Sequence, residues 1–356
     1  MPMSEQPPSP AHTSTGNDVL DEALTRLSRT GPEFASGLSN HGPMACDALV
    51  HLGRADAVSS WLDTYLPHLE EAPAPGRALA PDEWAGALGT ARRYPDWAAL
   101  FEQELSARPW AEVVTAWVPR LAPGSVAAGT HGLIRTAHAT RALAEADTPE
   151  RRLELAAGLA YWASKYRSLG AKPVPRGTLA VGQALAGTPV LAVGERSQGF
   201  IGDGAAQASR LEGFADAVDA LGPPPSIGGA LSELTSAMAG WYLANREHHP
   251  IAFVHGVTAP AALRLLLPYL PAQAAGTAFA YVWQVCAAIR SAFAVEHPPI
   301  DAGTEPPSAE ELAAKALERG GAHAIKLTEA CLREDAVQAD AVYLLAATDA
   351  SRRLAV

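Results

Sequence analysis

Apolar residues recur every three to four positions along most of this chain, which is the spacing of a helix that buries one face. Strict alternation of apolar and polar residues, which indicates a half-buried strand, is almost absent, and 190–193 is the one short strand that the sequence suggests. No self-similarity at a period of about 34 or 40 residues indicates a helical solenoid. The pattern therefore predicts an all-α fold built as a single large helical bundle.

The predicted helices are separated by segments rich in glycine and proline, which end helices. They span 19–29, 44–52, 56–69, 83–93, 97–107, 110–121, 131–146, 149–168, 178–186, 206–221, 227–245, 253–267, 272–294, 309–319, 322–333 and 336–353. Longer loops are expected at 71–81, 188–204 and 296–308. The glycine-rich loop at 188–204 is the longest candidate for a mobile lid.

Composition places the chain among globular proteins and limits its partners. Of 356 residues, 48% are hydrophobic and 18% are charged, which suffices for a buried core. Residues 1–17, rich in Pro, Ser and Thr and without the pattern of a signal peptide, are predicted to be a disordered tail, and residues 18–356 to be one domain. The net charge of −11 argues against nucleic acid and against an anionic membrane as partners.

Membrane insertion and disulfide chemistry are also not expected. The sequence has no run of 18 or more apolar residues, so no segment is predicted to span a bilayer. Its three cysteines, Cys46, Cys286 and Cys331, are scattered and form no Cys-x-x-Cys motif. This usage suits a reducing compartment, and we expect a cytoplasmic protein.

The histidines provide the first candidate chemistry. Three of the 11 precede a glycine close to an expected helix start, namely His41, His131 and His255, and His323 follows a pair of glycines at another. Helical bundles build metal centres from side chains that converge from several helices, so these four are candidate ligands. Taken singly, each histidine is equally consistent with a helix cap or a hydrogen-bonded core residue.

Lys326 lies on the same predicted helical face as His323, because residues three apart on a helix are neighbours. The chain has only four lysines among its 27 basic residues, so a lysine on a mostly apolar face is notable. A buried lysine is costly unless it is paired, neutral or chemically altered. The alternative is that its ammonium group extends to water.

Common cofactor and hydrolase motifs are missing from the sequence. It contains no Gly-x-Gly-x-x-Gly after a strand, no P-loop, no Gly-x-Ser-x-Gly and no His-Glu-x-x-His. The sequence thus gives no support to flavin, nucleotide or serine-hydrolase chemistry.

The histidine motifs, taken in order from about residue 20 to 350, resemble those of the questin oxidase family. The matching segments are Asn40-His41 before a helix ending at Leu52-Gly53, His131-Gly-Leu-Ile, His255-Gly-Val-Thr-Ala-Pro and His323-Ala-Ile-Lys326-Leu. Family members act on anthraquinone-type aromatic polyketides, through Baeyer–Villiger-type ring opening or, in one branch, as non-haem iron dioxygenases. The resemblance implies an oxidoreductase of specialised metabolism, such as antibiotic biosynthesis, with a small aromatic substrate and dioxygen.

The resemblance also implies a ligand set. In the iron-dependent branch, four histidines and a carboxylated lysine hold Fe(II), which places His41, His131, His255, His323 and Lys326 at the metal. Fungal members usually carry a second histidine where this chain has Arg135. Arg135 is a candidate for stabilising an anionic substrate, and the alternative is a surface or helix-pairing arginine. His138 and Glu247 are candidates for contacts to the ligands, and Trp241, Tyr242 and Trp283 for the pocket wall.

Several alternatives stay open at this stage. Carboxylated lysines also serve hydrolases, so a metal-dependent hydrolase or lyase is the second hypothesis, and a non-catalytic helical binding protein with structural histidines is the third. The sequence leaves open which substrate is bound, which bond is cleaved, and whether one or two oxygen atoms are inserted. It also leaves open whether NADPH serves as an external reductant and whether the protein is a monomer or a homodimer.

Overall fold

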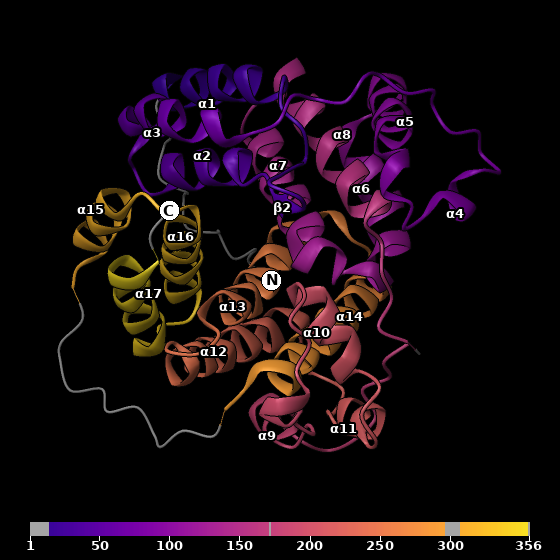
Figure 1. Cartoon of the computed structure of the whole chain (residues 1–356), viewed down its shortest axis with the longest axis vertical. Coiled ribbons are helices and arrows are strands. Elements are labelled where there is room, and N and C mark those ends of the chain that lie inside the picture. Colours follow the sequence, from indigo (N-terminus) through magenta and orange to yellow (C-terminus); the bar gives the residue numbers. More distant parts are fainter. Residues whose placement is uncertain (1–13, 171, 296–306, 355–356) are drawn as a thin grey trace, which may run out of the picture.

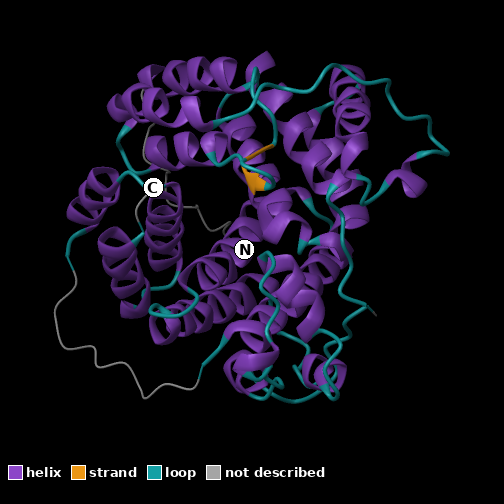
Figure 2. Ribbon diagram, viewed as in Figure 1, coloured by secondary structure: helices purple, strands orange, loops and turns teal. Residues whose placement is uncertain are grey.

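The structure, a computed structural model, describes residues 14–170, 172–295 and 307–354. Within these residues the chain is built almost wholly from helices, with one two-stranded hairpin (Figure 2). The all-α prediction is therefore confirmed. Residues 1–13 of the expected tail and most of the expected loop at 296–308 lie outside the described residues, and the remainder of the tail, from Ser14 on, begins the first helix.

The helices in the first half of the chain gather in the upper part of Figure 1. They are α1 (Ser14–Leu27), α2 (Gly42–His51), α3 (Val58–Tyr65), α4 (Trp84–Ala87), α5 (Tyr94–Ala107), α6 (Trp110–Leu121), α7 (His131–Glu145) and α8 (Pro149–Ser164). The hairpin consists of β1 (Glu33–Phe34) and β2 (Leu38–Ser39), paired antiparallel.

The second half of the chain fills the lower part of the same view (Figure 1). Its helices are α9 (Val181–Ala186), α10 (Ile201–Ala208), α11 (Phe214–Asp219), α12 (Ile227–Asn245), α13 (Pro250–Leu266), α14 (Ala272–Phe293), α15 (Ala309–Arg319), α16 (Ala322–Val337) and α17 (Ala341–Arg353). Short 3-10 turns connect the elements at Ala55–Ala57, Leu66–His68, Ala91–Arg93, Ala122–Gly124, Ala127–Thr130, Val193–Glu195 and Leu267–Tyr269.

Three sequence-based predictions of local structure are wrong. The suggested strand at 190–193 is irregular and runs into a 3-10 turn, while the real hairpin at 33–39 is too short to show an alternating pattern. The single helix expected over 206–221 is two, α10 and α11, because Gly213 adopts a left-handed backbone (φ 77°) between them. The helix expected over 83–93 is reduced to α4 and a 3-10 turn.

One helical segment, Pro250–Tyr269, has the length and apolar composition of a membrane span. In the structure 72% of its most apolar stretch is buried inside the protein. It begins as α13, which packs against α12, α14, α7 and α16. Its hydrophobicity is thus that of a helix surrounded by other helices on nearly all sides.

Four helices form a closed ring in the middle of the molecule. Helix α2 packs against α7, α7 against α13, α13 against α16, and α16 returns to α2. Two members lie early in the chain and two lie late, so the ring joins the upper and lower halves of the molecule (Figure 1). Side chains that project from these helices toward the centre of the ring meet each other.

Candidate metal centre

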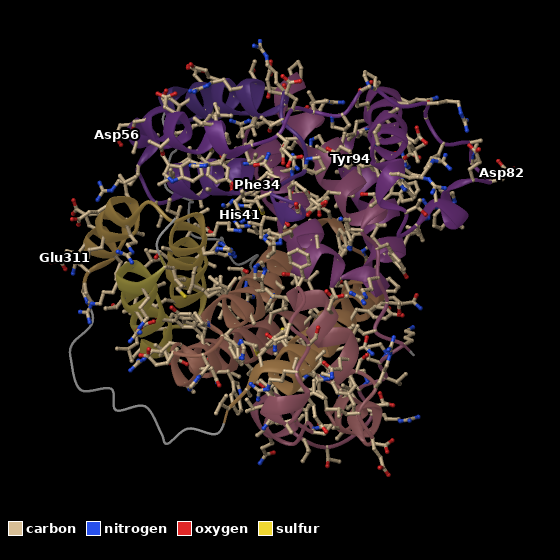
Figure 3. The ribbon with its side chains drawn as sticks, in the orientation of Figure 1. Phe34, His41, Asp56, Asp82, Tyr94 and Glu311 are labelled. Carbon is tan, nitrogen blue, oxygen red and sulfur yellow. The ribbon has the colours of Figure 1, made fainter. Side chains whose placement is uncertain are left out.

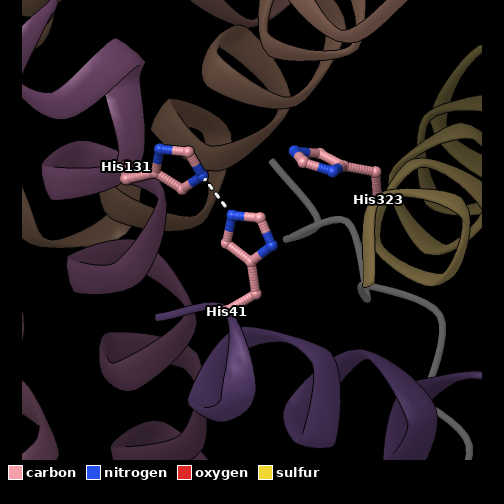
Figure 4. Close-up of side chains that lie close together, drawn as sticks. All are labelled: His41, His131 and His323. Atoms are coloured by element: carbon pink, nitrogen blue, oxygen red, sulfur yellow. Dashed lines mark hydrogen bonds between the residues drawn. The ribbon is translucent and has the colours of Figure 1, made fainter. Parts of the chain in front are cut away.

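Four imidazoles converge at this ring, one from each helix. The Nε2 atoms of His41 and His131 lie 2.8 Å apart, and those of His255 and His323 lie 3.4 Å apart. The ring centroids of His131 and His255 are separated by 4.4 Å. Figure 4 shows His41, His131 and His323 pointing toward one another from three separate helices, and each of them offers a ligand nitrogen within 4.8 Å of the others.

The helix positions of these residues explain how their side chains reach a common point. His41 is the residue just before α2, His131 is the first residue of α7, and His323 is the second residue of α16. Side chains at a helix start extend beyond the packed body of the helix. His255 differs, because it lies in the sixth position of α13. The sequence had predicted a position close to the beginning of that helix.

The glycine after His131 allows α7 to approach α8 closely. A Cβ atom on Gly132 would lie 2.6 Å from the Cα of Trp162, a separation that real structures do not show. The backbone of α8 cannot retreat as a flexible side chain could. The His-Gly dipeptide at this position therefore combines a side chain for the centre with the space needed for helix packing beside it.

Hydrogen bonds on the outer ring nitrogens orient two of the imidazoles. His131 Nδ1 lies 2.6 Å from the Ala128 carbonyl oxygen, which can only accept, so Nδ1 carries the proton and donates. Neutral His131 then presents an unprotonated Nε2 to the centre. His255 Nδ1 lies 3.1 Å from the Thr130 hydroxyl. The backbone N–H of His41 donates to the Tyr65 hydroxyl at 2.8 Å.

These distances suit a shared metal ion. Two imidazole nitrogens bound to one divalent ion at about 2.1 Å and at roughly a right angle are about 3 Å apart. The observed separations of 2.8 and 3.4 Å bracket that value. His41, His131 and His323 form the group whose ligand nitrogens all lie within 4.8 Å of one another, and His255 adjoins that group through His323. Nitrogen donors from imidazole are preferred by iron, zinc, copper and nickel, and are not typical of calcium or magnesium sites. The donor set therefore fits a first-row transition metal.

Burial keeps the four imidazoles neutral, as metal ligands must be. Burial, reinforced by the charge of Lys326, lowers the pKa of His131 to about 3. Burial also holds the pKa of His41, His255 and His323 well below the usual range, with Lys326 contributing in each case. All four can therefore offer a lone pair at neutral pH.

Lys326 lies among these imidazoles. Its side chain is 2% exposed, and it makes no ion pair within the described part of the chain. Burial lowers the pKa of its amine to about 7. The charge of the amine contributes to the lowered pKa of all four imidazoles, and Lys326 does not line the cavity that reaches them.

A cavity of about 1070 Å³ opens onto the cluster, and all four histidines line it. Its wall is formed by the β1–β2 hairpin, by the segment before α7 and by the start of α10 (Figure 3 shows Phe34 beside His41 in the middle of the molecule). The wall combines apolar side chains, namely Phe34, Leu38, Val126, Phe200, Ile201 and Ile251, with the charged residues Glu33, Glu70, Lys165, Arg167 and Asp203. Ligand pockets typically combine such apolar walls with a few polar groups.

Two ion pairs flank the cavity. Lys165 Nζ lies 2.8 Å from Glu33 Oε1, and Arg167 Nη1 lies 2.7 Å from Asp203 Oδ1. All four residues line the cavity. Phe200, which is 56% exposed, reaches across to the hairpin and contacts Gly37. The expected lid segment thus contributes a large apolar side chain to the cavity, together with Gly199, Gly202 and Asp203.

The two other candidate site residues take different positions from those expected. Arg135 does not line the large cavity, because its guanidinium donates to both carboxylate oxygens of Glu154 on α8, at 2.6 and 2.8 Å. Arg135 thus joins α7 to α8, as the helix-pairing alternative predicted. His138 also lies outside the cavity, with its Nδ1 2.6 Å from Asp47 Oδ2.

The aromatic wall residues and Glu247 are corrected in the same way. Trp283 donates its indole N–H to the Val218 carbonyl, and Tyr242 donates its hydroxyl to Asp349, both within the core. Neither they nor Trp241 line the cavity. Glu247 pairs with Arg353 and is 62% exposed.

A polar cluster joins α2, α7 and α16 and was not predicted from the sequence. Arg141 of α7 pairs with Asp47 of α2 and with Glu329 of α16, and Asp47 also accepts from His138. Buried charged residues of this kind are retained only when they are paired. The signal in the sequence was the presence of Asp47 and Glu329 within otherwise apolar helical faces.

Comparisons with known proteins do not add an identity to this geometry. The chain matches no family model, and no curated protein is significantly similar to it.

Proposed function

We propose that this protein is a non-haem iron-dependent oxygenase that cleaves a carbon–carbon bond of an aromatic polyketide or a similar quinone. The observation that carries the proposal is the convergence of His41, His131, His255 and His323 from four helices at the floor of one large cavity. Four imidazoles that are held neutral by burial suit a divalent transition metal. The order of the histidine motifs resembles that of the questin oxidase family, in which such a set holds Fe(II).

Charge balance supports a role for Lys326 as an additional ligand in carboxylated form. Four neutral imidazoles supply no negative charge to offset a divalent cation in a buried site. An ammonium group at Lys326 would repel that cation, whereas a carbamate would attract it. The neutral amine attacks the carbon of carbon dioxide, a nitrogen–carbon bond forms, one oxygen gains the electron pair, and the amine proton leaves to solvent. Lys326 would then offer an oxygen ligand.

The cavity supports a bulky, flat and largely apolar substrate. A volume of about 1070 Å³ exceeds what a small metabolite needs, and apolar side chains form part of its wall. Phe34 and Phe200 provide aromatic faces on the hairpin and at the start of α10, against which a ring system can stack. The ion pairs Lys165–Glu33 and Arg167–Asp203 provide polar groups for phenolic or carboxylate oxygens.

Iron bound at this centre would supply the activation of dioxygen. The residues of the chain would then do the rest: the four histidines hold the ion, the apolar wall orients the aromatic rings over it, and the buried location keeps water away from the reacting atoms. The resemblance to the questin oxidase family allows NADPH as an external reductant, and this stays a prediction.

Metal analysis of the purified protein, combined with oxygen consumption in the presence of an anthraquinone, tests the proposal. We expect one iron per chain in the wild type and its loss in the His255→Ala and Lys326→Ala variants. His68→Ala, which alters an exposed histidine that does not line the cavity, should retain iron. A folded wild-type protein that binds no transition metal under anaerobic Fe(II) loading would contradict the proposal.

The same experiment separates the alternative functions. Stoichiometric zinc without consumption of dioxygen would favour a metal-dependent hydrolase or lyase in this cavity. Absence of any metal together with tight binding of an apolar ligand would favour a binding protein with structural histidines.

A further inference from the structure

We infer that Thr130 is a positioning residue whose hydroxyl fixes the His255 imidazole with its Nε2 facing the candidate metal centre. The inference deepens the proposed function, since it rests on a metal bound by the four histidines. Thr130 belongs to no recognised ligand motif, and it touches neither the substrate cavity nor, through its own atoms, the metal position. The evidence for its role is its left-handed backbone and the hydrogen bond between its hydroxyl and His255.

The backbone around Thr130 is strained. Ala128 (φ 49°), Gly129 (φ 64°) and Thr130 (φ 78°) are three consecutive residues in the left-handed region, directly before His131. Glycine adopts this conformation readily, but a β-branched residue there is a genuine outlier. Such strained residues cluster at functional sites, where the surrounding structure holds them in place.

The strained turn places two polar groups where the imidazoles need them. The Ala128 carbonyl oxygen accepts from His131 Nδ1 at 2.6 Å, and the Thr130 hydroxyl oxygen lies 3.1 Å from His255 Nδ1. One three-residue segment thus contacts the outer nitrogen of a ligand on α7 and that of a ligand on α13. A regular helical turn would direct its carbonyls along the helix axis and could not serve both.

The hydroxyl at residue 130 can accept a hydrogen bond from the His255 tautomer that a metal needs. A metal on Nε2 requires the ring proton to be on Nδ1, and that proton needs an acceptor because His255 is 1% exposed. The Thr130 hydroxyl oxygen is the acceptor in contact. Without it, a buried N–H would be left unsatisfied when the metal binds, and the other tautomer would compete.

Thr130 is fully buried, so its shape and its hydroxyl can be separated by substitution. Thr130→Val keeps the branched shape and removes only the hydroxyl, whereas Thr130→Ser keeps the hydroxyl and removes only the methyl group. A positioning role predicts that Ser preserves the site and Val damages it. A role in packing alone predicts the reverse order.

The experiment measures Co(II) affinity and the visible spectrum of the Co(II)-loaded protein, together with thermal melting of the metal-free protein. We expect Thr130→Val to weaken Co(II) binding by about 10- to 100-fold and to alter the spectrum, and Thr130→Ser to stay within about threefold of the wild type. Thr140→Val is the matched control, because its buried hydroxyl bonds only to the Thr136 carbonyl in its own helix. It should leave Co(II) binding unchanged.

The outcomes separate this inference from the proposed function. If the wild type binds no metal, the proposed metal site itself fails. If the wild type binds Co(II) and Thr130→Val binds it equally well with the same spectrum, the role of Thr130 is overturned while the metal site stands. If Thr130→Val lowers the melting temperature of the metal-free protein, Thr130→Ser still tests the inference. Only a role that depends on the hydroxyl predicts normal Co(II) binding by the Ser variant.

Discussion

The guanidinium of Arg141 lies against the carboxylate of Glu329, which joins α7 to α16 one helical turn beyond Lys326. The same guanidinium pairs with Asp47 on α2. A single buried side chain therefore connects three of the four helices that carry the candidate ligands. The spacing of the histidines depends on how these helices sit against each other, so this ion-pair cluster is expected to control metal affinity from a distance.

Replacing Arg141 by Gln should weaken both folding and metal binding. Loss of the cation breaks two ion pairs, although Asp47 keeps His138 and Glu329 keeps Arg333 as partners. Breaking such pairs costs up to about 3–5 kcal/mol. We expect a fall of that size in the free energy of unfolding, and at least a tenfold loss of Co(II) affinity as α2, α7 and α16 shift. Chemical denaturation and metal titration measure the two effects separately.

Arg151→Gln is the matched control for that prediction. Arg151 is fully buried, and its ion pair with Asp21 joins α8 to α1, neither of which carries a candidate ligand. It also donates to the Ala142 carbonyl, near the end of α7 that lies away from His131. This variant should lose comparable stability while its Co(II) affinity stays near the wild-type value. Equal losses of affinity in both variants would show that the Arg141 effect is only a general loss of stability.

The ion-pair cluster also predicts how stability depends on pH. Burial opposes ionisation of Asp47 and Glu329, but Arg141 outweighs it and holds the pKa of each carboxyl well below the ordinary values of 3.8 and 4.5. A carboxyl with a lowered pKa in the folded state binds protons more weakly there than in the unfolded state. Its contribution is therefore complete above pH ~5 and is lost as the pH falls below about 4.

Denaturation curves of the metal-free protein between pH 3 and 7 test this dependence. The wild type should lose stability steeply below pH ~4, and Glu329→Gln should show a shallower loss from a lower starting value. Identical pH profiles for the two proteins would rule out a contribution of Glu329 to the acid dependence.

Gly132→Ala should destabilise the fold by about 1–3 kcal/mol, because the added Cβ would collide with the backbone of Trp162 and push α7 from α8. Gly240→Ala on α12 offers a control, since no atom lies within 4 Å of the added Cβ there. That variant should be neutral or more stable by up to about 1 kcal/mol, as expected for alanine in a helix. Thermal melting of both variants in parallel distinguishes steric collision from helix propensity.

Lys326→Ala should abolish tight metal binding, and short carboxylic acids such as formate or acetate should restore part of it by supplying a carboxylate in the vacated space. Isotope-labelled bicarbonate added to the wild type should give a carbamate signal in carbon NMR when a diamagnetic metal such as zinc is bound. Lys165→Ala, which removes a lysine from the cavity wall, should retain both metal and signal. Metal binding by Lys326→Ala equal to that of the wild type, without added acid, would exclude a ligand role.

The fold class could be predicted because nearly every helix carries its own apolar spacing. The neighbours of each helix could not be predicted, because periodicity indicates which residues are buried but not which helix packs against them. Arg135 illustrates this: one turn beyond His131 on α7, it was a candidate for stabilising a substrate, but its side of the helix meets Glu154 of α8. The hairpin at 33–39 was missed because two residues per strand are too few to show a pattern.

The candidate ligands could be found from sequence because they lie next to or near glycines in an ordered set, and three of them stand at helix starts. Their orienting partners could not be found. Nothing in a sequence marks Thr130 as left-handed, since a β-branched residue is the last one expected there. The Ala128 carbonyl is a backbone atom, and its role depends wholly on conformation.

The closed ring of α2, α7, α13 and α16 has a consequence for how the protein matures. Its first ligand lies near the beginning of the chain and its last ones near the end, and the contact between α2 and α16 joins them. During synthesis α16 is made after the other three helices, so a nascent chain can offer at most three of the four imidazoles. We therefore expect a metal to bind only after α16 has been synthesised. A bound ion would then be present only in molecules in which α2 and α16 have packed against each other.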